Sequence, residues 1–189
     1  MKCMPYTVAS SASKFMKVQF PFAQSAILLC ALLGVASAQQ LPRLQEENLA
    51  GQKVVLPDAA AGKIAVLVFG FSRASQKPTE AWSKRAQDEF GKHPSFVLYQ
   101  LPVLEDAPRF IRGVITSGMK KNVPENQRTS FVPVMNSEVE LKKLVNYKEA
   151  DDAYIVVLDR SGEVVYQTHG AADAAGYAEL RNKLQGLLN

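Results

Sequence analysis

An uninterrupted run of six apolar residues, at positions 64–69, constrains the fold more than any other part of the chain. A strand that meets protein on both faces needs no polar alternation, so this run predicts a central strand of a sheet covered on both sides. A helix should follow, because Pro78 suits a first helical turn. Trp82, Ala86 and Phe90 then recur on one helical face. The pattern is a buried strand followed by a covering helix.

The same pair of elements occurs a second time. Residues 96–99 predict a strand, and Pro108 precedes a second helical pattern of apolar residues: Phe110, Ile111, Val114, Ile115 and Met119. Two strand-helix units in succession imply parallel strands joined by right-handed crossovers.

The C-terminal third predicts an antiparallel hairpin and a helix. Residues 154–158 and 164–166 flank a turn at 159–162, which is typical of two paired strands. Tyr177, Leu180, Leu184 and Leu187 mark a last helix.

Less regular segments precede and interrupt these units. Residues 41–56 form a lead with a turn at Gly51, and residues 131–135 suggest a short strand. A short helix is expected next, because Ser137 and Glu140 have the spacing of a capping box. We found no internal repeat, so a single domain over residues 39–189 is expected.

The first 38 residues have the pattern of a secretory signal peptide. Lys14 and Lys17 supply a positive region, residues 26–35 an apolar region, and Ala36-Ser37-Ala38 a cleavage site before Gln39. The apolar run is too short to span a bilayer, so cleavage after Ala38 and a periplasmic or secreted protein without a membrane span are predicted. Counted from Met16, the signal has the usual length, which places the true start there.

Cleavage would remove both cysteines, Cys3 and Cys30. Leu29 precedes Cys30, which argues against a lipidation site there. The formal net charge of +4 would fall almost to neutral with the lysines of the signal. Such a surface carries no basic footprint for nucleic acid.

Residues of the first predicted strand and of the C-terminal hairpin carry a resemblance to a known superfamily. Residues 66–72 resemble the strand that leads into the redox loop of redoxin and TlpA-type proteins, and residues 156–165 with Gly170 resemble their terminal hairpin. The resemblance implies an α/β fold: a thioredoxin-like three-layer α/β/α sandwich with a central mixed β-sheet.

The same alignment places residues 74–77 where that superfamily has its Cys-x-x-Cys motif, so Ala74 and Lys77 replace the two cysteines. A helix N-terminus at this point normally stabilises a thiolate. Residues 151–154 stand where the family has a cis-proline. The resemblance therefore implies a retained scaffold without its nucleophile.

A narrower resemblance is to the ATP-synthase assembly-factor family of mitochondria and its bacterial relatives. Asn146, residues 154–159 and residues 170–172 are similar to its C-terminal pattern, although Val165 and Tyr166 replace an expected Arg-Trp pair. This family generally lacks the redox cysteines. The resemblance implies an assembly or chaperone role.

One loop stands out as a candidate binding site at the vacated redox position: Ser72, Arg73, Ala74, Ser75, Gln76 and Lys77. Backbone N–H groups at a helix N-terminus, helped by Arg73 and Lys77, would receive a carboxylate or phosphate. The competing interpretation, a capped helix start with solvated charges, is the commoner situation.

Other polar residues gave weaker signals. Ser75 has no evident base as a nucleophile, His169 is expected to be structural or solvated, and His93 is expected to lie in a loop. Two distant histidines without cysteine predict no metal, and no cofactor is expected. Arg109 and Arg112, with Lys120 and Lys121 beyond, would form a solvated helix face or contact a partner or lipid headgroups.

The aromatic residues at helical spacing are predicted to be core: Trp82, Phe90, Phe110 and Tyr177. Taken together, the sequence favours an exported, non-catalytic protein that binds a protein partner as a chaperone or assembly factor. The alternatives are a redoxin-type thiol or peroxide oxidoreductase whose cysteines are lost, and a structural envelope protein without a specific partner.

Overall fold

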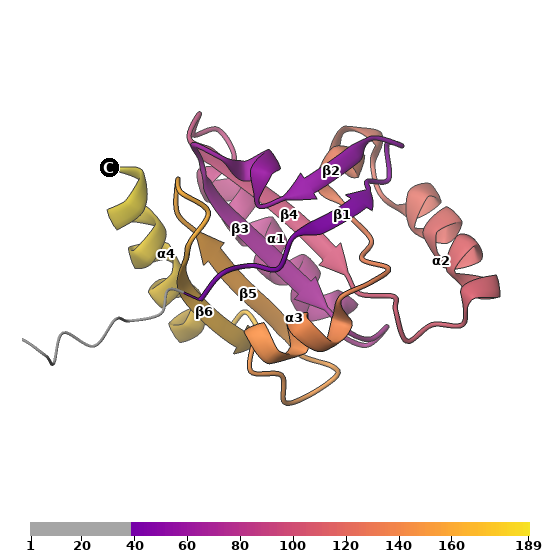
Figure 1. Cartoon of the computed structure of the whole chain (residues 1–189). Coiled ribbons are helices and arrows are strands. Elements are labelled where there is room, and N and C mark those ends of the chain that lie inside the picture. Colours follow the sequence, from indigo (N-terminus) through magenta and orange to yellow (C-terminus); the bar gives the residue numbers. More distant parts are fainter. Residues whose placement is uncertain (1–38) are drawn as a thin grey trace, which may run out of the picture. The chain divides into compact units, whose positions relative to one another are not determined.

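Four strands form the central sheet of the protein in a computed structural model that describes residues 39–189 (Figure 1). β3 (Ile64–Gly70) pairs with the parallel strand β4 (Phe96–Pro102) on one side. On its other side it pairs with the antiparallel strand β5 (Ala153–Leu158), and β6 (Val164–Gly170) lies beyond β5. The expected signal peptide, residues 1–38, lies outside the described residues.

β3 is buried on both faces, as its apolar run predicts. Alternate side chains of a strand point to opposite faces, so one strand supplies two cores. Leu67 and Phe69 belong to the core on one face, and Val66 and Val68 to the core on the other.

Helices α1 (Gln76–Phe90) and α4 (Ala174–Leu188) cover one face of the sheet. Trp82 is fully buried there, and its indole N–H donates to the carbonyl of Gly170 over 2.9 Å. Phe90 is also buried, so both residues are core, as predicted. Tyr177 is half-buried, with the Arg85 guanidinium 4.8 Å from its ring centroid.

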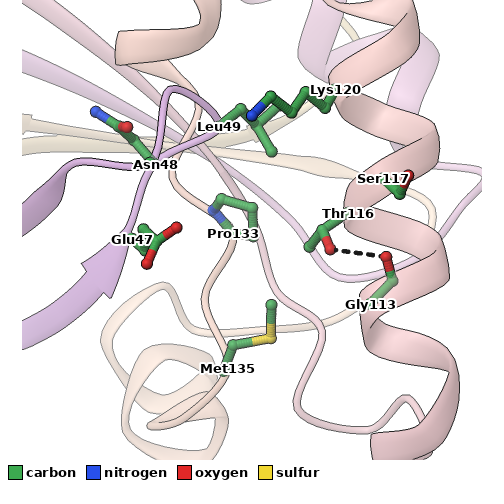
Figure 2. A pocket seen from close by; sticks show the side chains of 10 residues that line it. Glu47, Asn48, Leu49, Gly113, Thr116, Ser117, Lys120, Pro133 and Met135 are labelled. Atoms are coloured by element: carbon green, nitrogen blue, oxygen red, sulfur yellow. Dashed lines mark hydrogen bonds between the residues drawn. The ribbon is translucent and has the colours of Figure 1, made fainter.

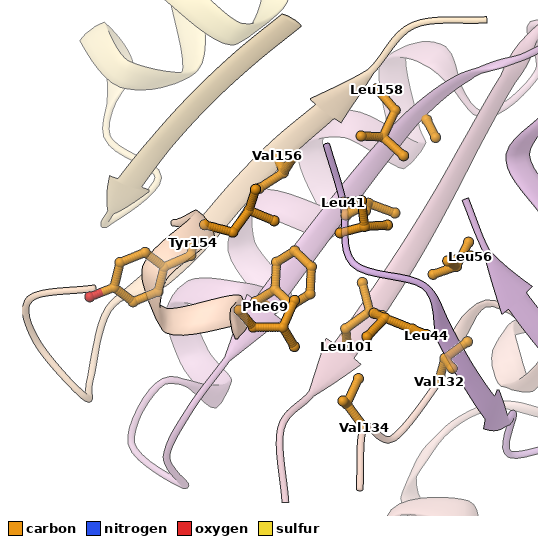
Figure 3. Packing of buried hydrophobic residues seen from close by; sticks show 14 of the residues in the cluster. Leu41, Leu44, Leu56, Phe69, Leu101, Val132, Val134, Tyr154, Val156 and Leu158 are labelled. Atoms are coloured by element: carbon orange, nitrogen blue, oxygen red, sulfur yellow. The ribbon is translucent and has the colours of Figure 1, made fainter. Parts of the chain in front are cut away.

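The opposite face is covered by a hairpin, β1 (Leu44–Glu47) with β2 (Lys53–Leu56), and by the short helix α3 (Glu138–Leu144). Figure 3 shows Leu44 and Leu56 of the hairpin over Phe69 and Leu101 of the sheet. Two short 3₁₀ helices, η1 (Asp58–Ala60) and η2 (Glu125–Ser130), lie in the connections. The predicted three-layer arrangement around a mixed sheet is confirmed.

The strand suggested at residues 131–135 is reduced to two isolated parallel bridges, from Phe131 to Gln100 and from Val134 to Val103. On either side of Pro133, the N–H groups of Val132 and Val134 donate to the carbonyls of Gln100 and Pro102.

The capping box predicted at Ser137 is absent. Ser137 has a left-handed backbone, φ 69°, and its side chain makes no capping hydrogen bond. A helix cap of this kind needs an extended backbone. The Glu105 carboxylate instead accepts from the N–H of Glu138 over 2.5 Å.

Phe110 is not a core residue, because 84% of its surface is exposed. It lies on α2 (Arg109–Asn122), which has no buried residue and stands beside the sheet (Figure 1). The sheet face that α2 might have covered is already occupied by the β1–β2 hairpin and α3.

Candidate functional site

The loop between β3 and α1 lies at the carboxyl end of the central strand and carries the candidate residues 72–77. Its backbone is held from within: the Ser72 hydroxyl oxygen accepts from the N–H groups of Ala74 and Ser75 over 3.0 and 3.1 Å. The N–H of Gln76 donates to the Arg73 carbonyl. Because these donors are engaged, any anion at this loop would depend mainly on the exposed side chains of Arg73 and Lys77.

Ser75 is a structural residue of this loop. It is only 1% exposed, and its hydroxyl donates to the carbonyl of Ser72 over 2.8 Å. A nucleophilic serine needs its proton shared with a base, whereas this proton is directed at a backbone oxygen. The geometry agrees with the interpretation that Ser75 is not a nucleophile.

Residues 151–154, which lead into β5, lie against the same loop. The resemblance places the cis-proline of the superfamily in this segment. The hydroxyl of Ser72 donates to the Asp151 carboxylate over 3.0 Å. The structure thus brings together the two segments that, in the superfamily, carry the cysteines and the cis-proline. In this chain they are joined by a serine-aspartate hydrogen bond.

An aromatic cluster next to this junction was not predicted from the sequence. Phe71 meets the ring of Tyr147 edge-on with centroids 5.2 Å apart, and Tyr147 stacks on Tyr154 at 5.6 Å. The Lys142 ammonium lies 4.8 Å from the Tyr147 centroid, within the range of a cation–π contact. Phe71 follows the predicted strand at residues 64–69 after Gly70, and this position was the only signal that the sequence gave for the cluster.

Tyr154 fixes the loop that carries the aspartates. Its hydroxyl accepts from the N–H groups of Lys148 and Glu149 and donates to the Glu149 carbonyl. Its ring is fully buried and stacks on His169, with centroids 5.5 Å apart. This anchored tyrosine orders the loop opposite residues 72–77.

The two histidines both have local partners. His169 Nδ1 lies 2.8 Å from the Asp152 carboxylate, so the imidazole is bound to the loop before β5. His93 Nδ1 accepts from the N–H of Ser95 within a turn. Each histidine therefore has a structural contact, and His93 lies in a loop.

A separate pocket of about 320 Å³ lies between the β1–β2 turn and α2 (Figure 2). Buried Asn48 at its edge has its polar atoms satisfied: Oδ1 accepts from two backbone N–H groups, and Nδ2 donates to the Thr129 carbonyl. None of residues 72–77 lines this pocket. It is distinct from the candidate loop.

Within residues 39–189, no three His, Cys, Asp or Glu side chains gather as a metal-binding group. The prediction of no metal stays a prediction. In the same part of the chain, no helix is both long enough and apolar enough to cross a membrane.

The sheet order, the layers and the position of the loop together define a thioredoxin-like fold. Three solved structures share this fold. A candidate thiol:disulfide interchange protein DsbE from Chlorobium tepidum matches with TM-score 0.56 and 18% identity over 80% of this chain and 97% of its own. The exposed lipoprotein thioredoxin Etrx1 of Streptococcus pneumoniae gives 0.54 and 12% over 75% and 99%. A SCO1/SenC family lipoprotein of Bacillus anthracis gives 0.53 and 14% over 81% and 97%.

The particular family follows from the sequence match. The model of the family described as ATP10 protein matches residues 34–187, and the chain belongs to this family. None of the curated proteins matches the chain. Both resemblances inferred from the sequence are thus confirmed.

Proposed function

We propose that this chain is an exported, non-catalytic thioredoxin-like protein that binds a protein partner as an assembly or chaperone factor. One observation carries the proposal: Ala74 and Lys77 stand where the fold otherwise keeps its cysteines, while the bond from Ser72 to Asp151 keeps the site assembled. Membership in the ATP10 protein family supports an assembly role.

The chemistry of the replaced residues argues against redox turnover. A thiolate cycles between reduced and oxidised forms, whereas neither an alanine methyl nor a lysine ammonium does. Both cysteines of the chain, Cys3 and Cys30, precede the described residues. What the loop does present is two exposed cations, Arg73 and Lys77, at the N-terminal end of α1. Such a surface suits an acidic segment of a protein partner.

The experiment is affinity capture from the native envelope fraction, with the bound proteins identified by mass spectrometry. Arg73→Ala/Lys77→Ala should lose most of a specifically captured partner. Lys63→Ala is the matched control, because Lys63 is an exposed cation at the opposite end of β3. Equal recovery by the parent chain and the double variant would remove the loop from the proposal.

The redoxin-type alternative is favoured by one observation, the fold shared with thiol-disulfide proteins. Insulin reduction and peroxide consumption separate the two functions. We expect neither reaction from residues 39–189, and turnover in either would replace the binding role with an enzymatic one.

Export has its own test. N-terminal sequencing of the protein recovered from its host should begin at Gln39, directly after the Ala36-Ser37-Ala38 site. A recovered chain that retains residues before Gln39 contradicts cleavage at this position.

A further inference from the structure

Helix α2 exposes two large apolar side chains that nothing within residues 39–189 covers. Phe110 and Val114, one turn apart, are 84% and 71% exposed. Ile111, Ile115 and Met119 are half-buried, and the helix has no buried residue. An exposed apolar face on a helix of this kind marks an interaction surface.

The apolar side chains of α2 are divided between two surroundings. At roughly 100° per residue, the five apolar side chains fall within one half of the circumference. Residues of the other half, including Gly113, Thr116 and Ser117, line the pocket against the β1–β2 turn (Figure 2). Within the apolar half, Ile111, Ile115 and Met119 are half-buried, whereas Phe110 and Val114 are exposed. The exposed side of α2 also carries Gly113, Ser117 and Lys120.

Three cations share the exposed side with Phe110 and Val114: Arg109, Lys120 and Lys121. α2 contains Arg109, Arg112, Lys120 and Lys121 and no acidic residue. The two acids that precede it are engaged with α3: Glu105 accepts from the N–H of Glu138, and Asp106 lies 3.4 Å from Lys142. The next acid, Glu125, follows beyond Pro124 in η2. The local charge of α2 is therefore positive.

Arg112 holds the helix in this orientation. Its guanidinium donates to three backbone carbonyls, of Glu105, Ala107 and Met135. These bonds attach the first turns of α2 to the loops on either side of it. Phe110 and Val114 are thus presented by a fixed helix.

We propose that α2 lies on an anionic phospholipid surface, with Phe110 and Val114 inserted among the acyl chains and Arg109 and Lys121 at the headgroups. An exposed helix side that carries apolar and cationic side chains and no acid is suited to a bilayer interface, where burial of apolar area and attraction to acidic lipids add. This surface is independent of the partner proposed for the 72–77 loop.

Charge distinguishes this occupant from a second copy of the chain. An isologous dimer through α2 would bring the same cations of two helices against each other, because each subunit contributes the same patch. An acidic bilayer supplies the opposite charge. A protein groove with acidic borders would be a different occupant, and the experiment below separates it from lipid.

The test is co-sedimentation with vesicles of phosphatidylcholine alone and of phosphatidylcholine with phosphatidylglycerol. Both the full chain and residues 39–189, which contain both cores, are used. We expect both forms to bind the acidic vesicles and to be released by high salt. Phe110→Ser/Val114→Ser should bind at least about tenfold more weakly, because the buried area of two side chains is lost. Arg109→Ala/Lys121→Ala should bind roughly tenfold more weakly.

Val139→Ser is the matched control, because Val139 is 77% exposed but lies on α3. It should bind as the parent does. All substituted residues are exposed, so circular dichroism should show unchanged folding.

Three results would overturn the proposal. Binding by the full chain alone would assign the affinity to residues 1–38. Binding of residues 39–189 that is unchanged in Phe110→Ser/Val114→Ser would assign it to another face. No vesicle binding, with loss of a captured protein or of a dimer in that variant, would make α2 a protein interface.

Discussion

Helices α1 and α2 have similar positions in the chain but opposite surroundings. Each follows one strand of the parallel pair β3–β4, and each carries apolar residues every three or four positions. α1 buries Trp82, Ala86 and Phe90 against the sheet, whereas α2 buries none of its residues. The same sequence pattern thus yields a core helix in one place and, in the other, a helix whose apolar residues are exposed or half-buried.

Apolar periodicity therefore predicts which residues share a helical face, but it does not predict what that face packs against. α1 packs on the side of the sheet that it shares with α4. The other side is filled by the β1–β2 hairpin and α3, both built from short and weakly patterned segments. The surroundings of α2 therefore depend on how other segments cover the sheet and not on the sequence of α2 itself.

The largest expected effect is on the free energy of unfolding, when Trp82 of α1 and, for comparison, Phe110 of α2 are each replaced by alanine. Trp82→Ala should reduce the free energy of unfolding by about 3–5 kcal/mol, because it leaves a cavity and removes the bond to Gly170. Phe110→Ala should change it by less than about 0.5 kcal/mol, because the side chain is exposed. Urea unfolding of both variants checks this. A comparable loss in Phe110→Ala would mean that α2 packs on the protein after all.

A smaller effect is expected when the attachment of α2 is removed. Arg112→Ala deletes the charged hydrogen bonds to the carbonyls of Glu105, Ala107 and Met135. The amides of α2 should then exchange with solvent about tenfold faster, while those of α1 keep their protection. Hydrogen exchange followed by mass spectrometry measures both helices at once. Equal loosening of α1 would show that the two helices unfold as one unit.

The smallest effect concerns a carboxyl group on the α2 side of the molecule. Burial raises the pKa of Glu46 above its ordinary 4.5, although hydrogen bonds from Met135 and Asn136 partly oppose the shift. A raised pKa in the folded state favours the protonated carboxyl there. Its stabilising contribution is therefore full below pH 4.5 and is lost as the pH rises through the folded value.

Glu46→Gln cannot titrate and serves as the comparison. The stability of the variant minus that of the parent should be larger at neutral pH than at pH 4. The parent gains stability from protonation of Glu46 on acidification, whereas the variant has no carboxyl group there. Urea midpoints of both proteins from pH 4 to pH 7 measure the difference. A difference that does not vary with pH would contradict the raised pKa.

The sequence predicted the sheet well, because its central strand depends on local composition. Six consecutive apolar residues at 64–69 suffice to indicate burial on both faces, and the helices with their strands follow from spacing. Phe110 could not be placed in this way, because its exposure depends on how distant segments cover the sheet. Ser137 was misplaced for a related reason: a carboxylate from Glu105, distant in sequence, bonds the N–H of Glu138.

The candidate site was predictable in position and not in detail. Alignment of the central strand indicates the 72–77 loop, but the bond from Ser72 to Asp151 depends on the pairing of β3 with β5. The aromatic contacts of Phe71 and Tyr147 likewise depend on the path of an irregular loop. No periodic signal in the sequence encodes either contact.

The central claim is that the vacated redox position is a contact site for a protein partner. The most direct measurement places a photo-crosslinking amino acid at exposed Ala74 and, as the control, at exposed Lys63. After irradiation in the native envelope, we expect a discrete protein adduct from position 74 and none of that size from position 63. No adduct from position 74, or the same adduct from both positions, would contradict the account.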